Sequence, residues 1–457
     1  MNRVIRRSWI MVLFLLILVG GTGFFVGEYF LKSDSWVVSA GSPHVYNSTN
    51  IGCGRVQDRE GIMLLDIIDG RTYSDSLSIR QSTLHWVGDR KGNISAPAIS
   101  HYAKEMSGFD TLNGVYAYGG VGGDATLTLS SRVQTAALEA LNGRKGTVAV
   151  YNYKTGELLC AVTSPTFDPD NAPDLENEWN STYDGIYLNR FLQSSYVPGS
   201  IFKIVTTAAA LETIPDIQQQ KFTCTGTYAY GVDRVTCEAA HGTNDLKNAF
   251  ARSCNCAFAQ IADQLGKDVM SDYVEQFGLL DSVSFDGITT AKGNYDVTDA
   301  AAVELAWSCI GQYTDLINPC VYLNFVGAIA NGGREVYPHV VGRIQVGEEI
   351  TYEAEPAEGR QIMSPEAAQT LKEFMGYNVA AIYGDWNFPG LNVCAKSGTS
   401  QLGGGQTSNA MFAGFVEDEA YPLAFIVVIE NGGYGSTACV PVLSRVLGEC
   451  KAVMDLE

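Results

Sequence analysis

The N-terminal apolar run is the feature that most constrains how this 457-residue chain can fold. Residues 9–30 read "WIMVLFLLILVGGTGFFVGEYF", with Glu28 as the one acidic residue. About twenty apolar residues suffice for a helix to cross a bilayer. Three arginines precede the run, and basic residues favour the cytoplasmic side. We therefore expect a single-pass protein of the cell membrane, with a cytoplasmic N-terminus and an extracytoplasmic body. A cleaved signal peptide is the alternative, but the run is long and "GGTGF" is a poor cleavage site.

Composition excludes several classes of function. The 50 acidic residues outnumber the 30 basic ones and give a formal charge of −20, so nucleic acid is not an expected partner. The chain contains neither a phosphate-binding glycine loop nor a dinucleotide fingerprint, and we expect no cofactor. A Ser-His-Asp triad lacks support, since the five histidines are scattered and no G-x-S-x-G elbow is present.

Eleven cysteines leave the thiol chemistry open. Cys224 and Cys237 form the closest plausible disulfide loop, and the odd count leaves at least one thiol unpaired. In the segment "CTGTYAYGVDRVTCEAAH", Cys224, Cys237 and His241 are also candidate zinc ligands. A fourth ligand at regular spacing is missing, so a disulfide or plain thiols are favoured and no metal site is predicted.

The pattern of apolar residues predicts an α+β fold. Residues 31–125 contain short strand-like pieces such as "LSIRQSTLHWV" and one helical stretch, "SAPAISHYAKEM", which together indicate a small pedestal. An amphipathic helix follows at residues 131–141 and ends at Asn142-Gly143. Then "GTVAVYNYKTGELLCAVTS" predicts two strands joined by a turn at residues 154–156.

The remaining chain completes this prediction. Residues 165–380 are expected to be mostly helical with polar loops. Three strands follow, in "LNVCAKSGTSQ", "NAMFAGFV" and "PLAFIVVIENGG", and a helix at residues 438–454 ends the chain. Strands at both ends with helices between them predict one antiparallel sheet assembled from distant segments and flanked by helices. We expect three units: a cytoplasmic stub and transmembrane anchor at 1–30, the pedestal at 31–125, and the main domain at 126–457.

A lysine in an apolar helical run is the first chemical signal. In "YVPGSIFKIVTTAAALE", Lys203 follows Ser200 by three residues, which places both on one face of a helix. Burial lowers the pKa of a lysine. A neutral amine can then accept the serine proton and produce a nucleophile without a histidine. The helix start adds partial positive charge, which favours a developing alkoxide.

Two further motifs follow in order along the chain. "ARSCNCAF" contains the S-x-N motif Ser253-Cys254-Asn255, and "CAKSGTSQ" contains Lys396-Ser397-Gly398-Thr399 on an expected strand. Gly398 would allow the backbone to approach a ligand closely. Two other segments, "STN" at 48–50 and "KTG" at 154–156, also match the second and third motifs and are decoys, because both precede Ser200. The order S-x-x-K, S-x-N, K-S-G therefore occurs once in the chain.

These three motifs, in this order and in this frame, resemble the penicillin-recognising serine transferases and hydrolases. "HGTNDLKNAFARSCNCAFAQIADQLG", "GQYTDLINPCVYLNFVGAIANGG" and, in the pedestal, "GRVQDREGIMLL" resemble segments of class B penicillin-binding proteins. The resemblance covers nearly the whole chain. It implies a transpeptidase domain at 126–457 and a D,D-transpeptidase that cross-links peptidoglycan stem peptides through a serine acyl-enzyme and is inhibited by β-lactams.

The resemblance also implies a role for each motif residue. Ser200 would be the nucleophile and Lys203 its base, while Ser253, between Lys203 and Lys396, would pass a proton to the leaving amine. Asn255 would hold the substrate amide or orient Lys203. Lys396, Ser397 and Thr399 would bind the terminal carboxylate, and the N–H groups of Ser200 and Thr399 would form the oxyanion hole. Further implied partners are a polytopic membrane glycosyltransferase and other division or elongation proteins.

Two alternatives share the motifs. A D,D-carboxypeptidase or β-lactamase would use the same serine and lysine but admit water to the acyl-enzyme. A non-catalytic sensor or scaffold would bind wall fragments, which the intact lysines argue against. One departure from the family pattern is Ser130 in "LTLS", where Asp is common, and we interpret Ser130 as structural.

Overall fold

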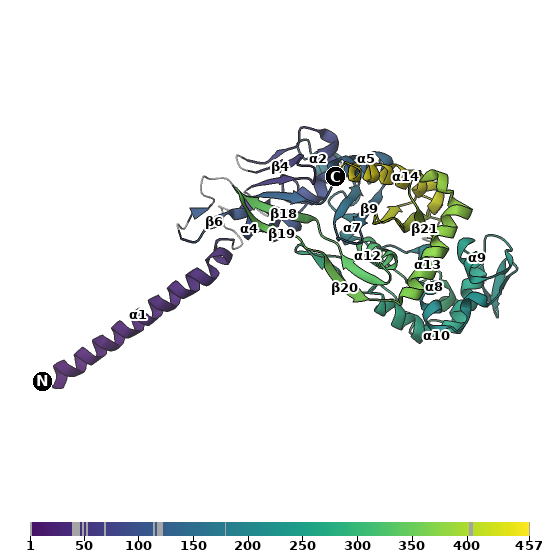
Figure 1. The fold of residues 1–457 in the computed structure, drawn as a ribbon, viewed down its shortest axis with the longest axis horizontal. Helices are drawn as coiled ribbons and strands as arrows, with labels where there is room; N and C mark the ends of the chain where they lie inside the picture. Colours follow the sequence, from purple (N-terminus) through teal and green to yellow (C-terminus); the bar gives the residue numbers. More distant parts are fainter. Residues whose placement is uncertain are drawn as a thin grey trace.

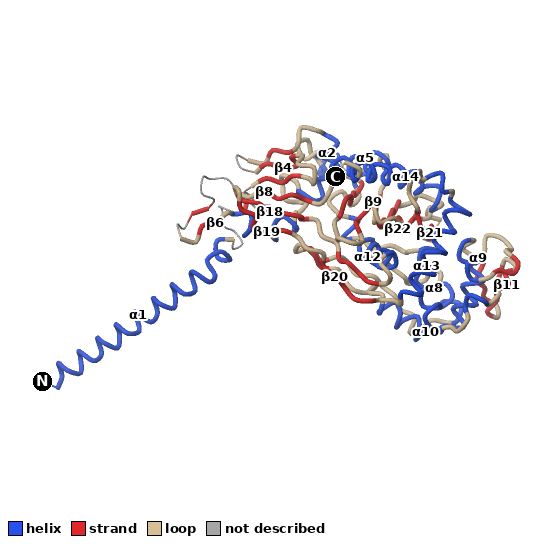
Figure 2. Tube along the Cα trace, viewed as in Figure 1, coloured by secondary structure: helices blue, strands red, loops and turns tan. Residues whose placement is uncertain are grey.

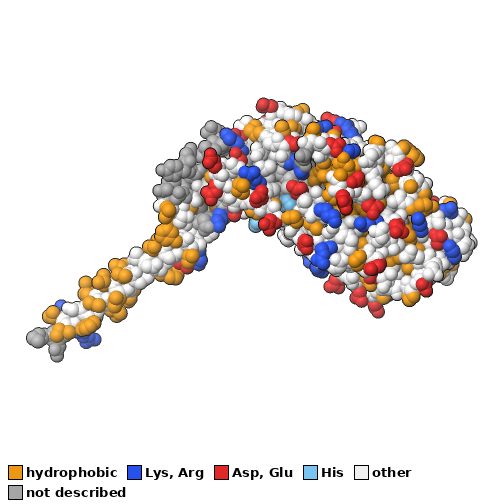
Figure 3. Space-filling view, in the orientation of Figure 1, with side chains coloured by type: hydrophobic (Ala, Val, Ile, Leu, Met, Phe, Trp, Pro, Cys, Tyr) orange, Lys and Arg blue, Asp and Glu red, His pale blue; other side chains and the backbone are white. Residues whose placement is uncertain are grey.

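One long helix projects from a rounded body (Figure 1). The computed structural model describes residues 2–38, 46–47, 50–51, 54–67, 70–112, 115–116, 122–178, 180–401 and 405–456. The projecting helix, α1 (Asn2–Val37), contains an 18-residue apolar stretch with no buried residue, and its segment Arg3–Ser33 is long and apolar enough to cross a membrane. Apolar side chains cover it in Figure 3. At about 1.5 Å per residue its length exceeds a ~30 Å hydrocarbon core.

A five-stranded antiparallel sheet forms the centre of the body, as the sequence predicts. Its strand order is β10-β9-β23-β22-β21. The predicted hairpin is confirmed as β9 (Gly146–Asn152) and β10 (Leu158–Ser164), and the C-terminal strands are β21 (Val393–Ser400), β22 (Asn409–Val416) and β23 (Leu423–Ile429). β23 lies between β9 and β22, so the two ends of the main domain meet in the middle of the sheet.

The central sheet is buried on both faces. Successive side chains of a strand point to opposite faces. On β9, Val148 and Val150 belong to one core, and Ala149 and Tyr151 belong to the other. The first core contains side chains of α5 (Ser131–Leu141) and α14 (Gly435–Met454). The second contains the all-buried helix α12 (Pro319–Ala330).

The remaining helices of the main domain lie mostly on the α12 side of the sheet (Figures 1 and 2). The longer ones are α8 (Lys203–Thr213), α10 (Asn255–Gln276) and α13 (Pro365–Asn378). The shorter ones are α6 (Leu175–Glu178), α7 (Arg190–Gln193), α9 (Leu246–Ala251) and α11 (Ala302–Ser308).

Short strands interrupt the region that was predicted to be mostly helical. They are β11 (Phe222–Cys224), β12 (Thr227–Tyr230), β13 (Asp233–Thr236), β14 (Gly242–Asn244), β15 (Ser284–Phe285), β16 (Ile288–Thr289), β17 (Arg334–Tyr337), β18 (Val341–Val346), β19 (Glu349–Glu353) and β20 (Ala357–Gln361). Seven of these strands have four residues or fewer, which is too short for alternation to be recognised from the sequence.

A second sheet joins the N-terminal segment to a distant part of the chain. Its order is β19-β18-β8-β3-β4-β5. The N-terminal strands are β3 (Arg55–Gln57), β4 (Met63–Asp66), β5 (Thr72–Tyr73) and β8 (Asp124–Leu127). β18 and β19 come from the other side of the predicted boundary at residue 125. That boundary stays a prediction, and the two flanking segments share one sheet.

The prediction of strand-like structure in "LSIRQSTLHWV" is wrong. These residues form helix α2 (Leu77–Val87), with a continuous buried run from Ser82 to Val87. Trp86 Nε1 donates to the carbonyl of Ala161 on β10 at 2.7 Å. Tertiary packing of this kind overrides local alternation. The predicted helix at 95–106 consists of α3 (Pro97–His101) and α4 (Ala103–Ser107), which meet at Tyr102.

Candidate active site

Ser200 lies at the start of the helical segment that contains Lys203, as predicted. The 3₁₀ helix η2 (Gly199–Phe202) leads directly into α8. Ser200 is half-buried, whereas the Lys203 side chain is fully buried. Gly199 has φ +56°, in the left-handed region that glycine adopts most readily. This turn presents the Ser200 hydroxyl to a cleft and keeps the lysine amine behind it.

The Lys203 amine is the centre of the site. Its Nζ lies 3.2 Å from Ser200 Oγ. It also lies 3.0 Å from Ser253 Oγ and 2.7 Å from both the Ser253 carbonyl and Asn255 Oδ1. The amine therefore contacts the hydroxyls of both motif serines, and the Asn255 carbonyl orients it.

The S-x-N motif stands at the N-terminus of α10. Cys254 is the N-cap residue, and Asn255 is the first residue of the helix. Ser253 has φ +53°, which a non-glycine residue adopts at a cost in free energy. Asn255 Nδ2 donates to the carbonyl of Thr236 at 2.8 Å, so its side chain links Lys203 to β13.

Lys396 approaches Ser253 from the opposite side. Its Nζ lies 3.2 Å from Ser253 Oγ and 3.0 Å from the Ser397 carbonyl, and its side chain is fully buried on β21. The Ser253 hydroxyl therefore lies between two lysine amines. The structure places five of the predicted site residues, Ser200, Lys203, Ser253, Asn255 and Lys396, within one hydrogen-bonded group.

Burial controls the charge of both lysines. It lowers the pKa of Lys203 to about 8. Burial, followed by the charge of Lys203, lowers the pKa of Lys396 well below its usual value. Two ammonium groups that share one hydroxyl repel each other, so protonation of one disfavours protonation of the other. With a pKa of about 8, roughly a tenth of the Lys203 amine is neutral at pH 7, and this fraction rises with pH.

The other residues of the K-S-G motif lie along β21. Ser397 Oγ lies 3.0 Å from the Tyr383 hydroxyl, which also accepts from the Ser397 N–H. Thr399 Oγ1 accepts from the Gly435 N–H at 3.0 Å. Both hydroxyls are half-buried and line the cleft.

Gly398 allows a close approach of backbones, but the partner is the chain itself. A β-carbon at Gly398 would lie 2.7 Å from the Pro198 carbonyl oxygen and 3.1 Å from the Ile201 nitrogen. The glycine predicted to admit a ligand thus lets β21 lie directly against η2. This contact fixes the distance between the serine and the K-S-G strand.

The cleft has a volume of about 590 Å³. Residues from several distant segments line it, among them Ser200, Thr236, Cys237, Glu238, His241, Arg252, Ser253, Asn255, Trp307, Gln312, Ile382, Tyr383, Ser397, Thr399, Tyr434 and Ser436. Sequence reasoning did not identify Tyr383, Trp307 or Tyr434 as cleft residues. None of the three stands in a recognisable motif, and only the fold brings them together.

The K-T-G decoy at 154–156 and Ser130, which departs from the family pattern, both have structural roles. Residues 154–156 form the β9–β10 turn, where Lys154 and Thr155 donate backbone N–H groups to Asn152 Oδ1. Ser130 caps α5, since its Oγ accepts from the Val133 N–H, and it also donates to the Glu60 carboxylate. The second decoy, 48–50, lies partly outside the described residues.

The ten described cysteines are all free thiols, so of the two expected states, a Cys224–Cys237 disulfide or plain thiols, the structure has the plain thiols. Cys53 lies outside the described residues. Cys224, Cys237, His241 and Cys254 instead form a cluster at the wall of the cleft.

Comparison with known proteins identifies the fold and family. Residues 146–448 match the penicillin binding protein transpeptidase domain family. The peptidoglycan D,D-transpeptidase PbpA of Mycobacterium tuberculosis is 27% identical over 73% of this chain and 72% of its own length. Stage V sporulation protein D of Bacillus subtilis is 26% identical over 85% of this chain and 60% of its own.

Solved structures share the fold of this chain. The D,D-transpeptidase domain of a peptidoglycan glycosyltransferase from Eggerthella lenta superposes with a TM-score of 0.75 at 27% identity, covering 89% of this chain and 99% of that one. The penicillin G acyl-enzyme of M. tuberculosis penicillin-binding protein A also has a TM-score of 0.75, at 24% identity over 88% and 99% of the two chains. The chain belongs to the penicillin-binding protein transpeptidase family.

Proposed function

We propose that this protein is a peptidoglycan D,D-transpeptidase that works through an acyl-enzyme on Ser200. The observation that carries the proposal is the buried Lys203 amine, 3.2 Å from the Ser200 hydroxyl. Relatives in the same family are named as peptidoglycan D,D-transpeptidases, which supports the same reaction here.

The first half-reaction forms the acyl-enzyme. Ser200 Oγ attacks the carbonyl carbon of the penultimate D-alanine while Lys203 Nζ accepts the hydroxyl proton. The peptide C–N bond then breaks. The leaving amine of the terminal D-alanine takes a proton through Ser253 Oγ, which contacts both lysines. The products are an ester on Ser200 and free D-alanine.

The second half-reaction transfers the acyl group. An amine of another stem peptide attacks the ester, its proton passes to the site, and the Ser200 hydroxyl is regenerated. A β-lactam follows only the first half. Its amide opens on Ser200, and because the leaving amine stays attached, the ester persists.

Strand β21 offers the means to align the peptide. It lies at one end of the sheet order, so one of its edges does not pair with another strand of the central sheet. An extended peptide can add to such an edge by backbone hydrogen bonds. Lys396, with the hydroxyls of Ser397 and Thr399, would then receive the terminal carboxylate. The N–H groups of Ser200 and Thr399 would stabilise the developing oxyanion.

The membrane orientation is part of this proposal. Three arginines precede the apolar part of α1, which favours a cytoplasmic N-terminus and places the cleft on the outer side with the cell wall. The glycosyltransferase and other division or elongation partners implied by the family resemblance stay predictions.

Labelling with a fluorescent penicillin tests the proposal. The full-length chain in detergent micelles is expected to form a stable adduct, and mass spectrometry should locate it on the peptide that contains Ser200. Ser200→Ala should abolish labelling. The matched control is Ser195→Ala, because the Ser195 hydroxyl donates to the Lys292 carbonyl and is not among the residues that line the cleft.

The lifetime of the adduct separates transpeptidase from hydrolase. A transpeptidase should keep the penicilloyl ester for many minutes in the absence of an acceptor amine. Turnover within seconds would support a β-lactamase instead. Labelling that survives in Ser200→Ala would overturn the assignment of the nucleophile.

A further inference from the structure

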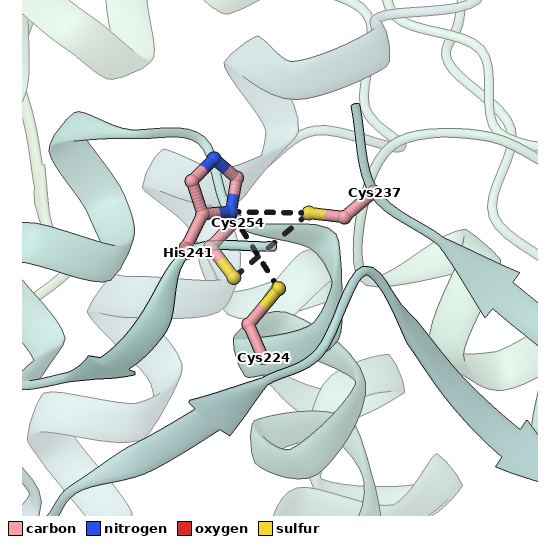
Figure 4. A group of neighbouring side chains, drawn as sticks. All are labelled: Cys224, Cys237, His241 and Cys254. Atoms are coloured by element: carbon pink, nitrogen blue, oxygen red, sulfur yellow. Dashed lines mark hydrogen bonds between the residues drawn. The ribbon is translucent and has the colours of Figure 1, made fainter. Parts of the chain in front are cut away.

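Four metal-ligand side chains converge beside the S-x-N motif. They are Cys224 at the end of β11, Cys237 after β13, His241 before β14 and Cys254 at the N-cap of α10. Their four donor atoms all lie within 4.8 Å of one another. Figure 4 shows three sulfurs and the His241 ring directed toward a common point.

The separations fit one tetrahedral metal ion. His241 Nδ1 lies 3.6 Å from Cys224 Sγ and 3.4 Å from Cys237 Sγ, and Cys237 Sγ lies 3.9 Å from Cys254 Sγ. Ligands about 2.3 Å from a tetrahedral zinc ion stand roughly 3.8 Å apart. A disulfide would require two sulfurs about 2.05 Å apart and would give the imidazole no role.

The surroundings of the cluster suit thiolate ligands. Cys224 and Cys254 are buried, and Cys237 and His241 are half-buried. The Asn255 N–H points at Cys237 Sγ at 3.2 Å, a contact typical of outer-shell support for a metal-bound sulfur. Arg252 Nη1 donates to the His241 carbonyl at 3.3 Å and holds the loop that contains the imidazole.

We propose that Cys224, Cys237, His241 and Cys254 bind a structural Zn²⁺ that positions Ser253 and Asn255 of the catalytic group. Three thiols lose their protons on binding, and with a neutral imidazole the site has one net negative charge. All four positions are filled by protein ligands, so the ion binds no water and has no part in the acyl transfer.

The position of Cys254 connects the proposed metal site to the catalytic residues. Cys254 is the middle residue of Ser253-Cys254-Asn255, so a metal bond to its sulfur fixes the backbone between the two motif side chains. Ser253 has a left-handed conformation that its surroundings must enforce. Zinc would provide this constraint by linking α10 to β11 and the β12–β13 hairpin.

Metal content is the first measurement. The full-length chain, purified in detergent without added metal, is expected to contain about one zinc per molecule by elemental mass spectrometry. Replacement of zinc by Co²⁺ should give the visible absorption of tetrahedral cobalt together with thiolate-to-metal charge transfer. Absence of both, or a Cys224–Cys237 disulfide in the purified chain, would overturn the proposal.

Variants assign the ligands. Cys224→Ala and His241→Ala should each lower zinc affinity by at least about tenfold. His241 is half-buried, so its replacement leaves no sealed cavity, and circular dichroism can verify the fold. Cys450→Ala is the matched control, because Cys450 is a buried free thiol on α14. Equal zinc affinity in His241→Ala and the control, measured by competition with a chelator, would contradict the ligand assignment.

Acylation by penicillin tests the positioning role. Removal of zinc from the wild type should slow acylation at least about tenfold, with little change in the initial binding constant. Added Zn²⁺ should restore the rate in the wild type but not in Cys224→Ala. An unchanged rate in the metal-free wild type would exclude the positioning role. Failure of the wild type to react with penicillin at all would contradict the proposed function and leave the zinc measurement standing.

Discussion

The backbone of Gly199 lies so close to Thr399 that a β-carbon on Gly199 would stand 2.6 Å from the Thr399 carbonyl oxygen. Gly199 precedes the serine and Thr399 ends the K-S-G-T motif. The same two segments meet again where a β-carbon on Gly398 would lie 2.7 Å from the Pro198 carbonyl oxygen. Two glycines on facing backbones therefore set the separation between Ser200 and β21.

Replacement of Gly199 by alanine should impair acylation severely. The new methyl group would collide with a backbone oxygen, and φ +56° is unfavourable for alanine. A shift of the serine by about 1 Å can cost on the order of 10²-fold in rate. Stopped-flow acylation by a chromogenic β-lactam measures the effect.

The matched control for this variant is Gly347→Ala. Gly347 has φ +62° but no heavy atom within 4 Å of its β-carbon position. It should lose some stability and retain its acylation rate. Equal acylation rates in Gly199→Ala and the wild type would show that the close approach does not position Ser200.

The rate of acylation should rise with pH around pH 8. Lys203 must be neutral to accept the Ser200 proton, and burial lowers its pKa to about 8. The neutral fraction of Lys203 falls about tenfold for each pH unit below that value. The second-order rate constant for acylation, measured between pH 6 and pH 10, should show this rising limb. A midpoint near the value of an exposed lysine would mean that Lys203 is not the base.

Ser253→Ala should slow acylation while the chain still folds. The variant removes the hydroxyl that lies 3.0 Å from Lys203 Nζ and 3.2 Å from Lys396 Nζ. Loss of a proton-transfer group typically costs about 10²–10⁴-fold. The rate constant of the chemical step should fall more than the binding constant for the β-lactam. Ser253→Thr, which keeps a hydroxyl, should recover part of the rate.

Ser130→Ala should lower the free energy of unfolding by about 1 kcal/mol, the usual value of an N-cap hydrogen bond. Ser130→Asp preserves the cap but places a second carboxylate beside Glu60, whose pKa burial already raises. At neutral pH the Asp variant should be less stable than wild type, and adding Glu60→Gln should restore stability. Chemical denaturation measures all three. An Asp variant more stable than the wild type would contradict this explanation.

The local sequence was sufficient to predict the helices and strands whose apolar residues recur with a clear period. The helix at 131–141 and the five strands of the central sheet show strong patterns, and the structure has them where they were predicted. The three motifs placed Ser200, Lys203, Ser253 and Lys396 on the elements that bring them together. Spacing alone could not give their mutual distances.

The features that could not be predicted from the sequence depend on contacts between residues far apart in the chain. Helix α2 has a strand-like pattern, but Trp86 and its neighbours pack against the main domain. Cys254, the fourth member of the group with Cys224, Cys237 and His241, could not be predicted as a ligand from the sequence. It belongs to the S-x-N motif and lies on a different element from Cys224 and Cys237. No periodicity links such residues, and only the tertiary fold brings them into contact.

The place of β23 in the sheet has a consequence for biosynthesis. Because Leu423–Ile429 lies between β9 and β22, the ribosome must complete nearly the whole chain before these neighbours can be joined. Until then the hydrophobic edges of the nascent domain stay open to aggregation. A nonsense mutation anywhere upstream of residue 423 should therefore yield a polypeptide for degradation rather than a shortened enzyme.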